Sequence, residues 1–252
     1  MKNISAAALF LMVAFSAHSE TKYQLAEEWK YVPGKWSFVQ PRDITIDGND
    51  NIYVNDGGNL LKINTQGERM SAWKYPGYSE YNYISFIIDK AGIVYFLGIS
   101  DDSIVKYKYG GNLIATIGSY GNRDGEFDNP IDMAFDANGN IYVLDSRNCR
   151  VQKFDSNGIF VSKFGNKGSG NGDLDQPVYL AVDRQGNSYV ADFNTRRTTR
   201  TQKFDPSGSL ISIINDENYA YVKDMTVDSN FDVYILGDSG YVAKYSSSGM
   251  IS

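Results

Sequence analysis

Along most of this chain, short runs rich in apolar, β-favouring residues alternate with polar turns of Asp, Asn, Ser and Gly. The clearest stretch has four such runs, at residues 129–136, 140–145, 150–155 and 159–165. Short apolar runs bounded by turn residues are typical of antiparallel strands joined by tight hairpins. The pattern therefore predicts a four-stranded antiparallel meander in this stretch.

The same pattern returns five times, each time with an aspartate, a tyrosine six residues later, and then a lysine with a glycine five residues after it. The aspartate–tyrosine pairs are Asp47/Tyr53, Asp89/Tyr95, Asp136/Tyr142, Asp183/Tyr189 and Asp228/Tyr234. The lysine–glycine pairs are Lys62/Gly67, Lys106/Gly111, Lys153/Gly158, Lys203/Gly208 and Lys244/Gly249. Subtracting the aspartate positions gives spacings of 42, 47, 47 and 45 residues. Such a period is typical of supersecondary units that bury their faces against each other.

A four-stranded sheet cannot bury both of its faces alone, whereas several such sheets arranged radially can. We therefore expect an all-β fold, a β-propeller of four-stranded antiparallel blades. Because the aspartates and tyrosines of the repeat occur in five copies, we interpret them as structural rather than catalytic.

The third and fourth repeats resemble the NHL repeat. The residues that carry the resemblance are Pro130 to Asp136 and Pro177 to Asp183, Gly139 to Asp145 and Gly186 to Asp192, and Arg150 to Asp155 and Arg200 to Asp205. Repeats two and five depart from it, with Gly98 and Gly237 in place of the strand-ending aspartate, and Asp50 replaces the turn glycine of repeat one. The resemblance implies an NHL-repeat β-propeller over the mature chain. It does not imply one activity, since such propellers include binding modules and a few enzymes.

The number of blades depends on how the ring closes. The last repeat ends at residues 250–252, where its outer strand has barely begun, and residues 23–29 precede the first repeat as an unattached strand. Pairing these two ends would close a ring of five blades and remove a free sheet edge. Six blades, or a ring completed by a second molecule, is the alternative.

The N-terminus predicts export. A basic start, an apolar run over residues 6–17 and small residues at Ala17 and Ser19 match a secretory signal cleaved after Ser19. We therefore expect a signal peptide at 1–19, a propeller domain at 20–252, no membrane-spanning segment, and a monomer in the periplasm or outside the cell. The net charge is −6, and loss of Lys2 with the signal makes it −6 − 1 = −7. An acidic chain is a poor partner for nucleic acid.

Histidine and cysteine usage narrows the chemistry. The single histidine, His18, lies in the predicted signal, which excludes a histidine base, zinc ligand or catalytic triad in the mature protein. The single cysteine, Cys149, cannot form an intramolecular disulfide. It is either a buried small apolar residue or a free thiol.

We expect ligand recognition on one face of the propeller. With strands a to d counted from the axis outward, the b–c and d–a loops share that face, and there the repeats differ most. Aromatic residues and two additional arginines occur in these loops, and such side chains suit recognition of a peptide or glycan. The predicted ligand-binding residues are Trp36, Tyr78, Tyr81, Tyr83, Arg196, Arg197 and Tyr219. The alternatives are that the aromatic residues fill the space left where a degenerate repeat lacks its glycine-rich loop and that the arginines form a solvated loop tip.

A third group lies four residues before the repeat aspartates, where the innermost strand begins. Asp43, Asp132 and Asp224 occupy this position in repeats one, three and five, and Ser85 and Tyr179 in the other two. Carboxylates that converge on the axis could bind a hard cation such as Ca²⁺. Alternatively, each one bonds backbone amides at the start of its strand.

The preferred hypothesis is an exported, non-catalytic binding module, without a cofactor, that recognises a protein, peptide or glycan through its variable loop face. The alternative is a lyase or hydrolase that acts at the channel mouth with the aspartate cluster, Ca²⁺ and Tyr179 as base. Some related propellers are lyases that rely on histidine, which this mature chain lacks. A purely structural role, through exposed sheet edges, would require the ring to stay open.

Overall fold

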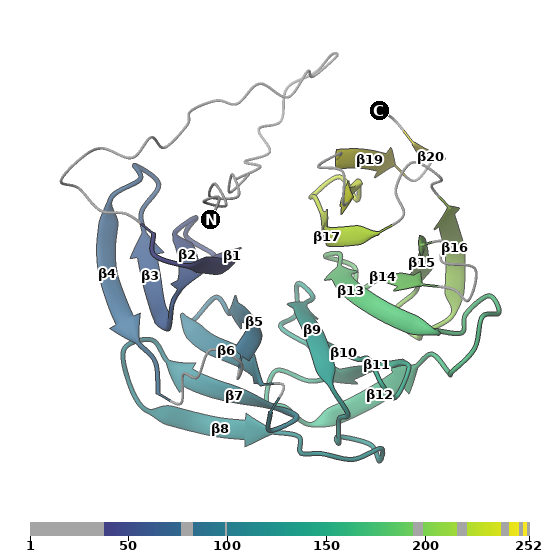
Figure 1. Ribbon diagram of the computed structural model, residues 1–252, viewed down its shortest axis with the longest axis horizontal. Helices are drawn as coiled ribbons and strands as arrows, with labels where there is room; N and C mark the ends of the chain where they lie inside the picture. Colours follow the sequence, from purple (N-terminus) through teal and green to yellow (C-terminus); the bar gives the residue numbers. More distant parts are fainter. Residues whose placement is uncertain are drawn as a thin grey trace, which may run out of the picture.

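The computed structural model describes residues 38–76, 83–98, 100–193, 199–215, 221–237, 242–246 and 249–250. These residues form twenty strands in five four-stranded antiparallel sheets. The described part of the chain contains no helix that could cross a membrane. Figure 1 shows the sheets arranged like blades around a common centre.

Each blade takes its strands in chain order. Blade 1 contains β1 (Pro41–Ile46), β2 (Ile52–Asp56), β3 (Asn59–Ile63) and β4 (Arg69–Lys74). Blade 2 contains β5 (Tyr83–Ile88), β6 (Ile93–Gly98), β7 (Ser103–Lys108) and β8 (Leu113–Ile117). Blade 3 contains β9 (Pro130–Phe135), β10 (Ile141–Asp145), β11 (Arg150–Phe154) and β12 (Phe160–Phe164). Blade 4 contains β13 (Gln176–Val182), β14 (Ser188–Phe193), β15 (Thr199–Phe204) and β16 (Leu210–Asn215), and blade 5 contains β17 (Val222–Val227), β18 (Val233–Gly237), β19 (Val242–Ser246) and β20 (Gly249–Met250).

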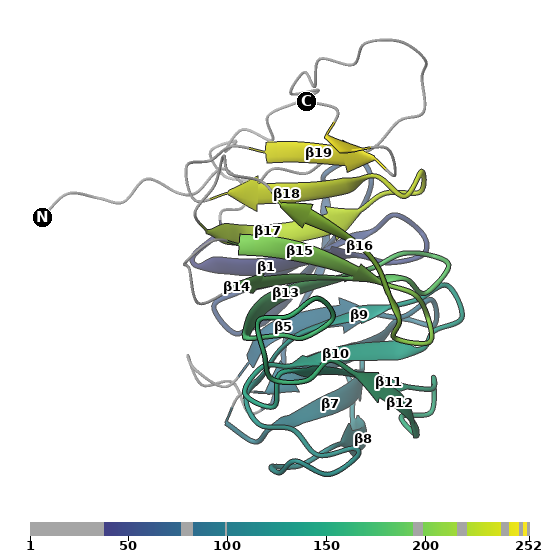
Figure 2. The ribbon, with the colours of Figure 1, turned by 90° about the vertical axis from the view of Figure 1, so that its right-hand side faces the viewer.

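The first strand of each blade lies innermost. Consecutive inner strands pack on each other in the order β1, β5, β9, β13 and β17. In the view from the side, blade 5 lies at the top, with blade 4 below it and blades 3 and 2 further down (Figure 2). The predicted all-β propeller with five four-stranded blades is therefore confirmed. The four described strands of blade 5 all come from the last repeat. The predicted pairing of residues 23–29 with this blade lies outside the described residues.

The repeated aspartate closes the turn between the first two strands of its blade. In blade 3, Asp136 Oδ1 accepts the amides of Asn138 and Asn140, both at 2.9 Å. Gly139 has a φ of 80° in this turn, which a residue without Cβ adopts freely. The turn is thus specified by residues that are close together in the sequence.

The repeated lysine covers the repeated tyrosine in every blade. Lys153 Nζ lies 4.9 Å from the centre of the Tyr142 ring and 3.8 Å from Asp136 Oδ2. The ring face and the carboxylate together stabilise a largely buried ammonium group. The other four pairs are Lys62 over Tyr53, Lys106 over Tyr95, Lys203 over Tyr189 and Lys244 over Tyr234. The repeated signature therefore forms the structural centre of each blade, as the sequence predicts.

The core consists of apolar layers between consecutive blades. Val143 and Leu144 are neighbours on β10, and their side chains point to opposite faces because successive residues of a strand alternate. Val143 packs with Leu97 of blade 2, and Leu144 packs with Leu180 of blade 4. All four side chains are buried. Burial on both faces explains why a single blade would not be stable alone.

Candidate functional site

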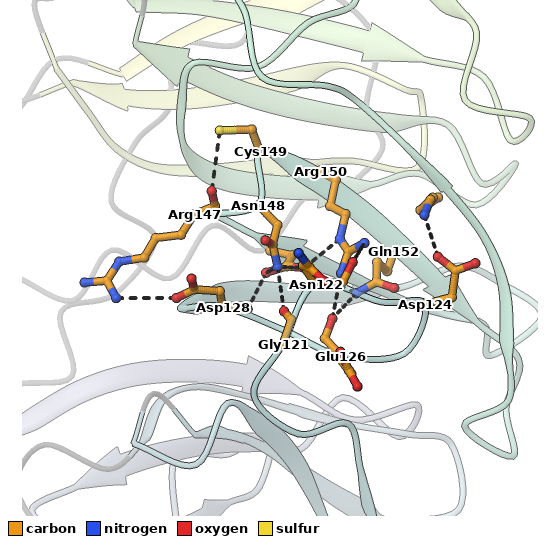
Figure 3. Close-up of polar contacts among 12 residues, drawn as sticks. Gly121, Asn122, Asp124, Glu126, Asp128, Arg147, Asn148, Cys149, Arg150 and Gln152 are labelled. Atoms are coloured by element: carbon orange, nitrogen blue, oxygen red, sulfur yellow. Dashed lines mark hydrogen bonds and ion pairs between the residues drawn. The ribbon is translucent and has the colours of Figure 1, made fainter.

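The b–c turn of blade 3 and the connection that leads into the same blade meet on one face of the molecule. Arg147 donates its backbone amide to the carbonyl of Asp128 at 3.1 Å. Asn148 donates its side-chain amide to the carbonyl of Gly121 at 2.9 Å (Figure 3). The sequence-based expectation that the two kinds of loop share a face holds for this blade.

Arg150, the first residue of β11, holds the connection in place. Its Nε donates to Asp145 Oδ2 at 2.7 Å, and its other nitrogens donate to the carbonyls of Asn122, Arg123 and Glu126 at 2.8–2.9 Å (Figure 3). Asp145 is fully buried. Burial raises the pKa of this carboxyl, while hydrogen bonds from the backbone and from Arg150 act in the opposite direction.

Gln152 binds the same connection, and Arg150 and Gln152 together form what we call the clamp of blade 3. Its side-chain nitrogen donates to the carbonyl of Glu126 at 2.6 Å, and its side-chain oxygen accepts the amide of Gly125 at 2.9 Å. Five hydrogen bonds from two buried side chains therefore fix a connection that has no strand of its own, apart from one isolated bridge between Tyr120 and Phe127. Directional bonds therefore hold this loop, together with the buried ring of Phe127.

Blade 4 repeats this arrangement one blade further on. Arg200 bonds Asp192 and the carbonyls of Ser169 and Asp173, and Gln202 bonds the carbonyl of Asp173 at 2.7 Å. Arg200 thus has the same structural role as Arg150, which begins the matching segment of the third repeat. The clamp itself depends on contacts between residues 24 to 31 positions apart, which a local pattern does not reveal.

A depression of about 450 Å³ opens to solvent beside the clamped connection of blade 3. Tyr120 stands at its rim with 72% of its surface exposed. The depression is lined by Tyr120, Gly121, Asn122, Arg123, Glu126, Asp128 and Asn148. Sequence reasoning missed this group. The signal that could have found it is a tyrosine and an arginine in a connection whose counterpart in blade 4 has Lys167 and Gly170 instead.

Cys149 lies on the same b–c turn but faces inward. It is 3% exposed, and its Sγ donates to the carbonyl of Asp175 at 3.4 Å. Burial raises the pKa of the thiol, so its reactive thiolate form is disfavoured. Of the two alternatives left open by the sequence, the structure supports the buried one.

The aspartates at the start of the inner strands join neighbouring blades. Asp132 Oδ1 accepts the amide of Met133 in its own strand at 2.8 Å, and Oδ2 accepts the amide of Leu180 in blade 4 at 2.8 Å. Both oxygens of this carboxyl are therefore occupied by backbone donors. This is the structural role that the sequence analysis left open as the alternative to cation binding.

Asp43 makes the same connection and Asp224 does not. Asp43 accepts the amides of Ile44 in its own strand and of Phe86 in blade 2. Asp224, in the last blade, accepts the amide of Met225 in its own strand, and no bond from it to another blade occurs among the described residues. Blades 2 and 4 have no aspartate at this position. The aspartate of the preceding blade therefore accepts a backbone amide of their inner strand.

The axial carboxyls influence one another electrostatically. Burial, with a smaller contribution from neighbouring carboxylates, raises the pKa of Asp43 to about 7 and that of Asp132 to about 8, against opposing hydrogen bonds from backbone amides. The pKa of Asp224 is raised as well, by burial. Burial and the charges of Asp224 and Asp132 also raise the pKa of Tyr179. Among the described residues, no three His, Cys, Asp or Glu side chains are grouped as a metal ion requires, and Ca²⁺ binding at the axis stays a prediction.

Most predicted ligand-binding residues lie outside the described part of the chain. This applies to Trp36, Tyr78, Tyr81, Arg196, Arg197 and Tyr219, and to the side chain of Tyr83, whose backbone begins β5.

Trp73 and Tyr75 begin the aromatic stretch at residues 73–83 that leads into the second repeat. Both are described, and both belong to the core. Tyr75 is 2% exposed and donates its hydroxyl to Asn55 at 3.0 Å. Trp73 packs edge-on against Tyr75, Tyr107 and other rings between blades 1 and 2. For these two residues the space-filling alternative is correct.

These features define a β-propeller with a rigid loop-bearing face. The sequence model of the NHL repeat matches residues 127–154, which span the third repeat from Phe127 to Phe154. This match confirms the resemblance to the NHL repeat over these residues, and the fold around them is a five-bladed β-propeller.

Known structures share the fold at low sequence identity. Virginiamycin B lyase from Staphylococcus aureus is 14% identical with a TM-score of 0.62, and the match covers 84% of this chain and 69% of that chain. A chain of a nidogen/laminin complex is 14% identical with a TM-score of 0.64 and coverage of 84% and 78%. The WD40 domain of Neurospora crassa Pan2 is 14% identical with a TM-score of 0.60 and coverage of 84% and 65%. No curated protein matches the sequence, and these likenesses show the fold alone.

Proposed function

We propose that this protein is an exported, monomeric, non-catalytic propeller that recognises a protein, peptide or glycan through the face bearing its b–c and d–a loops. The observation that carries the proposal is the clamped connection of blade 3, which presents an open polar depression to solvent on a rigid support. Rigid support of variable loops is the arrangement by which scaffolds carry binding sites. The nidogen/laminin complex is an example of a similar propeller in a protein assembly.

The residues argue against the chemistry of the lyase neighbour. A variant of virginiamycin B lyase with one histidine replaced by alanine, in complex with quinupristin, is described as catalytically inactive. The single histidine of this chain, His18, lies in its predicted signal peptide. The alternative function is a lyase or hydrolase at the axis, and one observation favours it: the pKa values of Asp43, about 7, and Asp132, about 8, suit proton transfer near neutral pH.

The test of binding compares the two faces of the propeller. Labelled protein is applied to peptide and glycan arrays as the wild type, as a loop-face variant (Trp36→Ala, Tyr81→Ala and Tyr120→Ala together) and as an opposite-face variant (Lys90→Ala with Arg184→Ala). Lys90 and Arg184 lie in the a–b turns of blades 2 and 4. We expect the probes captured by the wild type to be lost with the first variant and retained with the second. Equal capture by all three proteins would contradict recognition through the loop face.

Catalysis is tested directly with quinupristin. The protein is incubated with this compound, and the mixture is separated by chromatography to detect conversion. We expect no product. Conversion that disappears in Asp132→Asn would favour the axial enzyme instead.

Export is tested on protein recovered from its native cells. We expect the mass of a chain that begins at Glu20, in the extracytoplasmic fraction. A full-length chain that begins at Met1 in the cytoplasm would contradict the proposed signal.

A further inference from the structure

We infer that the depression of blade 3 is a binding site for a neutral saccharide. The inference rests on the proposed function and assigns one ligand class to one part of the loop face. It follows from the charge balance, the exposed ring, the unused polar groups and the rigidity of this site.

The charges at the depression balance when its neighbour Arg147 is counted. The lining contains one cation, Arg123, and two carboxylates, Glu126 and Asp128, and Arg147 lies outside the lining on the b–c turn. Arg147 pairs with Asp128 at 3.4 Å, and Glu126 Oε2 accepts the backbone amide of Arg123 at 3.0 Å. A phosphate or an acidic ligand is bound by an excess of cations, and a basic peptide by an excess of carboxylates. A balanced polar surface instead suits an uncharged ligand rich in hydroxyl groups.

Tyr120 supplies the apolar platform that such a ligand requires. Its ring is 72% exposed, while the backbone at this position is tied to that of Phe127 through the isolated bridge. Phe127 is fully buried, so the exposed ring is carried by an anchored backbone. An aromatic ring offers large contact area at low cost in side-chain entropy, and its hydroxyl adds a polar tip. The apolar face of a sugar ring can stack on such a platform.

Polar groups around the ring are left for a ligand. Among the described residues, the side chain of Asn122, the second oxygen of Glu126 and the second oxygen of Asp128 take part in no hydrogen bond or ion pair. All three residues line the depression. A carboxylate accepts hydrogen bonds from hydroxyl groups, and an amide both donates and accepts. Together they provide the mixed donors and acceptors that sugar hydroxyls can satisfy.

The site is preorganised. Arg150 and Gln152 hold the backbone of the connection through its carbonyls and the amide of Gly125. A loop that is already ordered loses little conformational entropy when a ligand binds. A shallow, open site with few apolar contacts can therefore still bind a small polar ligand.

Blade 4 provides a natural control. Its connection has the same clamp and the same isolated bridge, here between Lys167 and Leu174. Lys167 therefore takes the place of Tyr120, Ser169 that of Asn122, and Gly170 that of Arg123. Because this second connection lacks both the aromatic platform and the balancing arginine, we expect no saccharide to bind there.

The experiment uses saturation-transfer NMR on the full protein with chitotriose, maltotriose and mannotriose as neutral probes and sialyllactose as an acidic probe. We expect transfer to at least one neutral trisaccharide, a loss of affinity of about tenfold or more in Tyr120→Ala, and unchanged affinity in Lys167→Ala. The thermal unfolding of both variants is measured to confirm that each is folded. A third variant, Asp128→Asn, keeps the size of the side chain and is expected to weaken binding with the ring still in place.

The other outcomes overturn the inference in distinguishable ways. Absence of transfer to every neutral probe, transfer to sialyllactose alone, or equal affinity in Tyr120→Ala would each reject a neutral saccharide at this site. If peptide capture on the arrays is lost in the loop-face variant while no neutral probe binds, the saccharide inference fails and the proposed function stands. If neither peptide nor glycan capture depends on the loop face, both fail.

Discussion

Two pairs of blades have the same four-stranded sheet but differ in the side chains that pack beside it: blades 3 and 4 use polar side chains, and blades 1 and 2 use aromatic rings. In blades 3 and 4, the third strand carries Arg150 and Gln152, or Arg200 and Gln202, whose side chains bind the backbone of the incoming connection. In blade 1 the same positions, counted from the strand register, hold Asn59 and Leu61, and in blade 2 they hold Ser103 and Val105.

Between blades 1 and 2 the space is filled by rings instead. The rings of Tyr75 and Tyr107 each pack against both Trp73 and Phe96, which also contact each other, with ring centres 4.3–6.2 Å apart. Apolar contacts are not directional, so such a cluster fills space without fixing the path of a loop. Hydrogen bonds to backbone carbonyls do fix that path. Among the described residues, a pair of third-strand side chains that holds the incoming connection therefore occurs in blades 3 and 4.

The strand-ending aspartate explains the degenerate repeats. Asp145 and Asp192 accept the amides of Asp128 and Asp175, at the end of each incoming connection, and Asp56 of blade 1 accepts the amide of Val39 in the same way. Gly98 and Gly237 stand at this position in blades 2 and 5. Without a carboxylate, these blades cannot hold the incoming chain by this bond. The departure from the repeat pattern is therefore a local loss of one anchoring group, not a different fold.

The largest expected effect comes from breaking the clamp. Arg150→Ala leaves the buried charge of Asp145 unpaired, so we expect a loss of about 3–5 kcal/mol in the free energy of unfolding. The equivalent change in blade 1, Asn59→Ala, removes one long hydrogen bond of 3.4 Å and should cost less than about 1 kcal/mol. Urea unfolding of both variants measures the difference. Equal losses would show that the two blades are not stabilised differently.

The contribution of the aromatic cluster between blades 1 and 2 to stability is tested with Trp73→Ala. Because Trp73 is only half-buried, we expect a loss of about 3 kcal/mol, at the lower end for a tryptophan replaced by alanine. Thermal and urea unfolding measure it, with Tyr120→Ala as the control for an exposed ring, expected to cost less than about 0.5 kcal/mol. An unchanged stability of Trp73→Ala would mean that this ring is available for binding rather than part of the core.

A smaller difference should separate two axial aspartates. Asp132→Ala leaves the amides of Met133 and Leu180 without their acceptor, which should cost about 1–3 kcal/mol. Asp224→Ala removes a single bond, to Met225, and should cost less than about 1 kcal/mol. The two variants are compared by urea unfolding at the same pH. A larger loss in Asp224→Ala would reject the inter-blade role of Asp132.

A dependence of stability on pH should also originate at the axis. The folded-state pKa values of Asp43, about 7, and Asp132, about 8, lie above the ordinary aspartate value of 3.8. The folded state therefore binds these protons more tightly than the unfolded state, and stability falls as the pH rises from about 4 through 8. We expect a higher free energy of unfolding at pH 5.5 than at pH 8.5, with a weaker dependence in Asp132→Asn. An identical dependence in the variant would assign the effect to other groups.

The sequence by itself determined the repeat unit of this protein. Asp136, Tyr142 and the glycine of the a–b turn lie within six residues of each other and act in the same blade, so their spacing predicts both the turn and the strands. The five copies of this signature predict five blades. The same reasoning identified the axial aspartates and left two roles open for them, bonding of backbone amides and binding of a cation. A carboxylate at the start of a strand is compatible with either role.

Only the tertiary structure decided which groups meet across the repeats. Arg150 reaches the carbonyl of Asn122 over 28 positions, and Asp132 reaches the amide of Leu180 over 48 positions. These contacts depend on the angle between blades and on the path of a loop without regular structure, and neither is encoded in a local pattern of residues. The depression beside Tyr120 lies on the connection that Arg150 holds. The sequence determined what each blade is, and the tertiary structure determined where the proposed binding site lies.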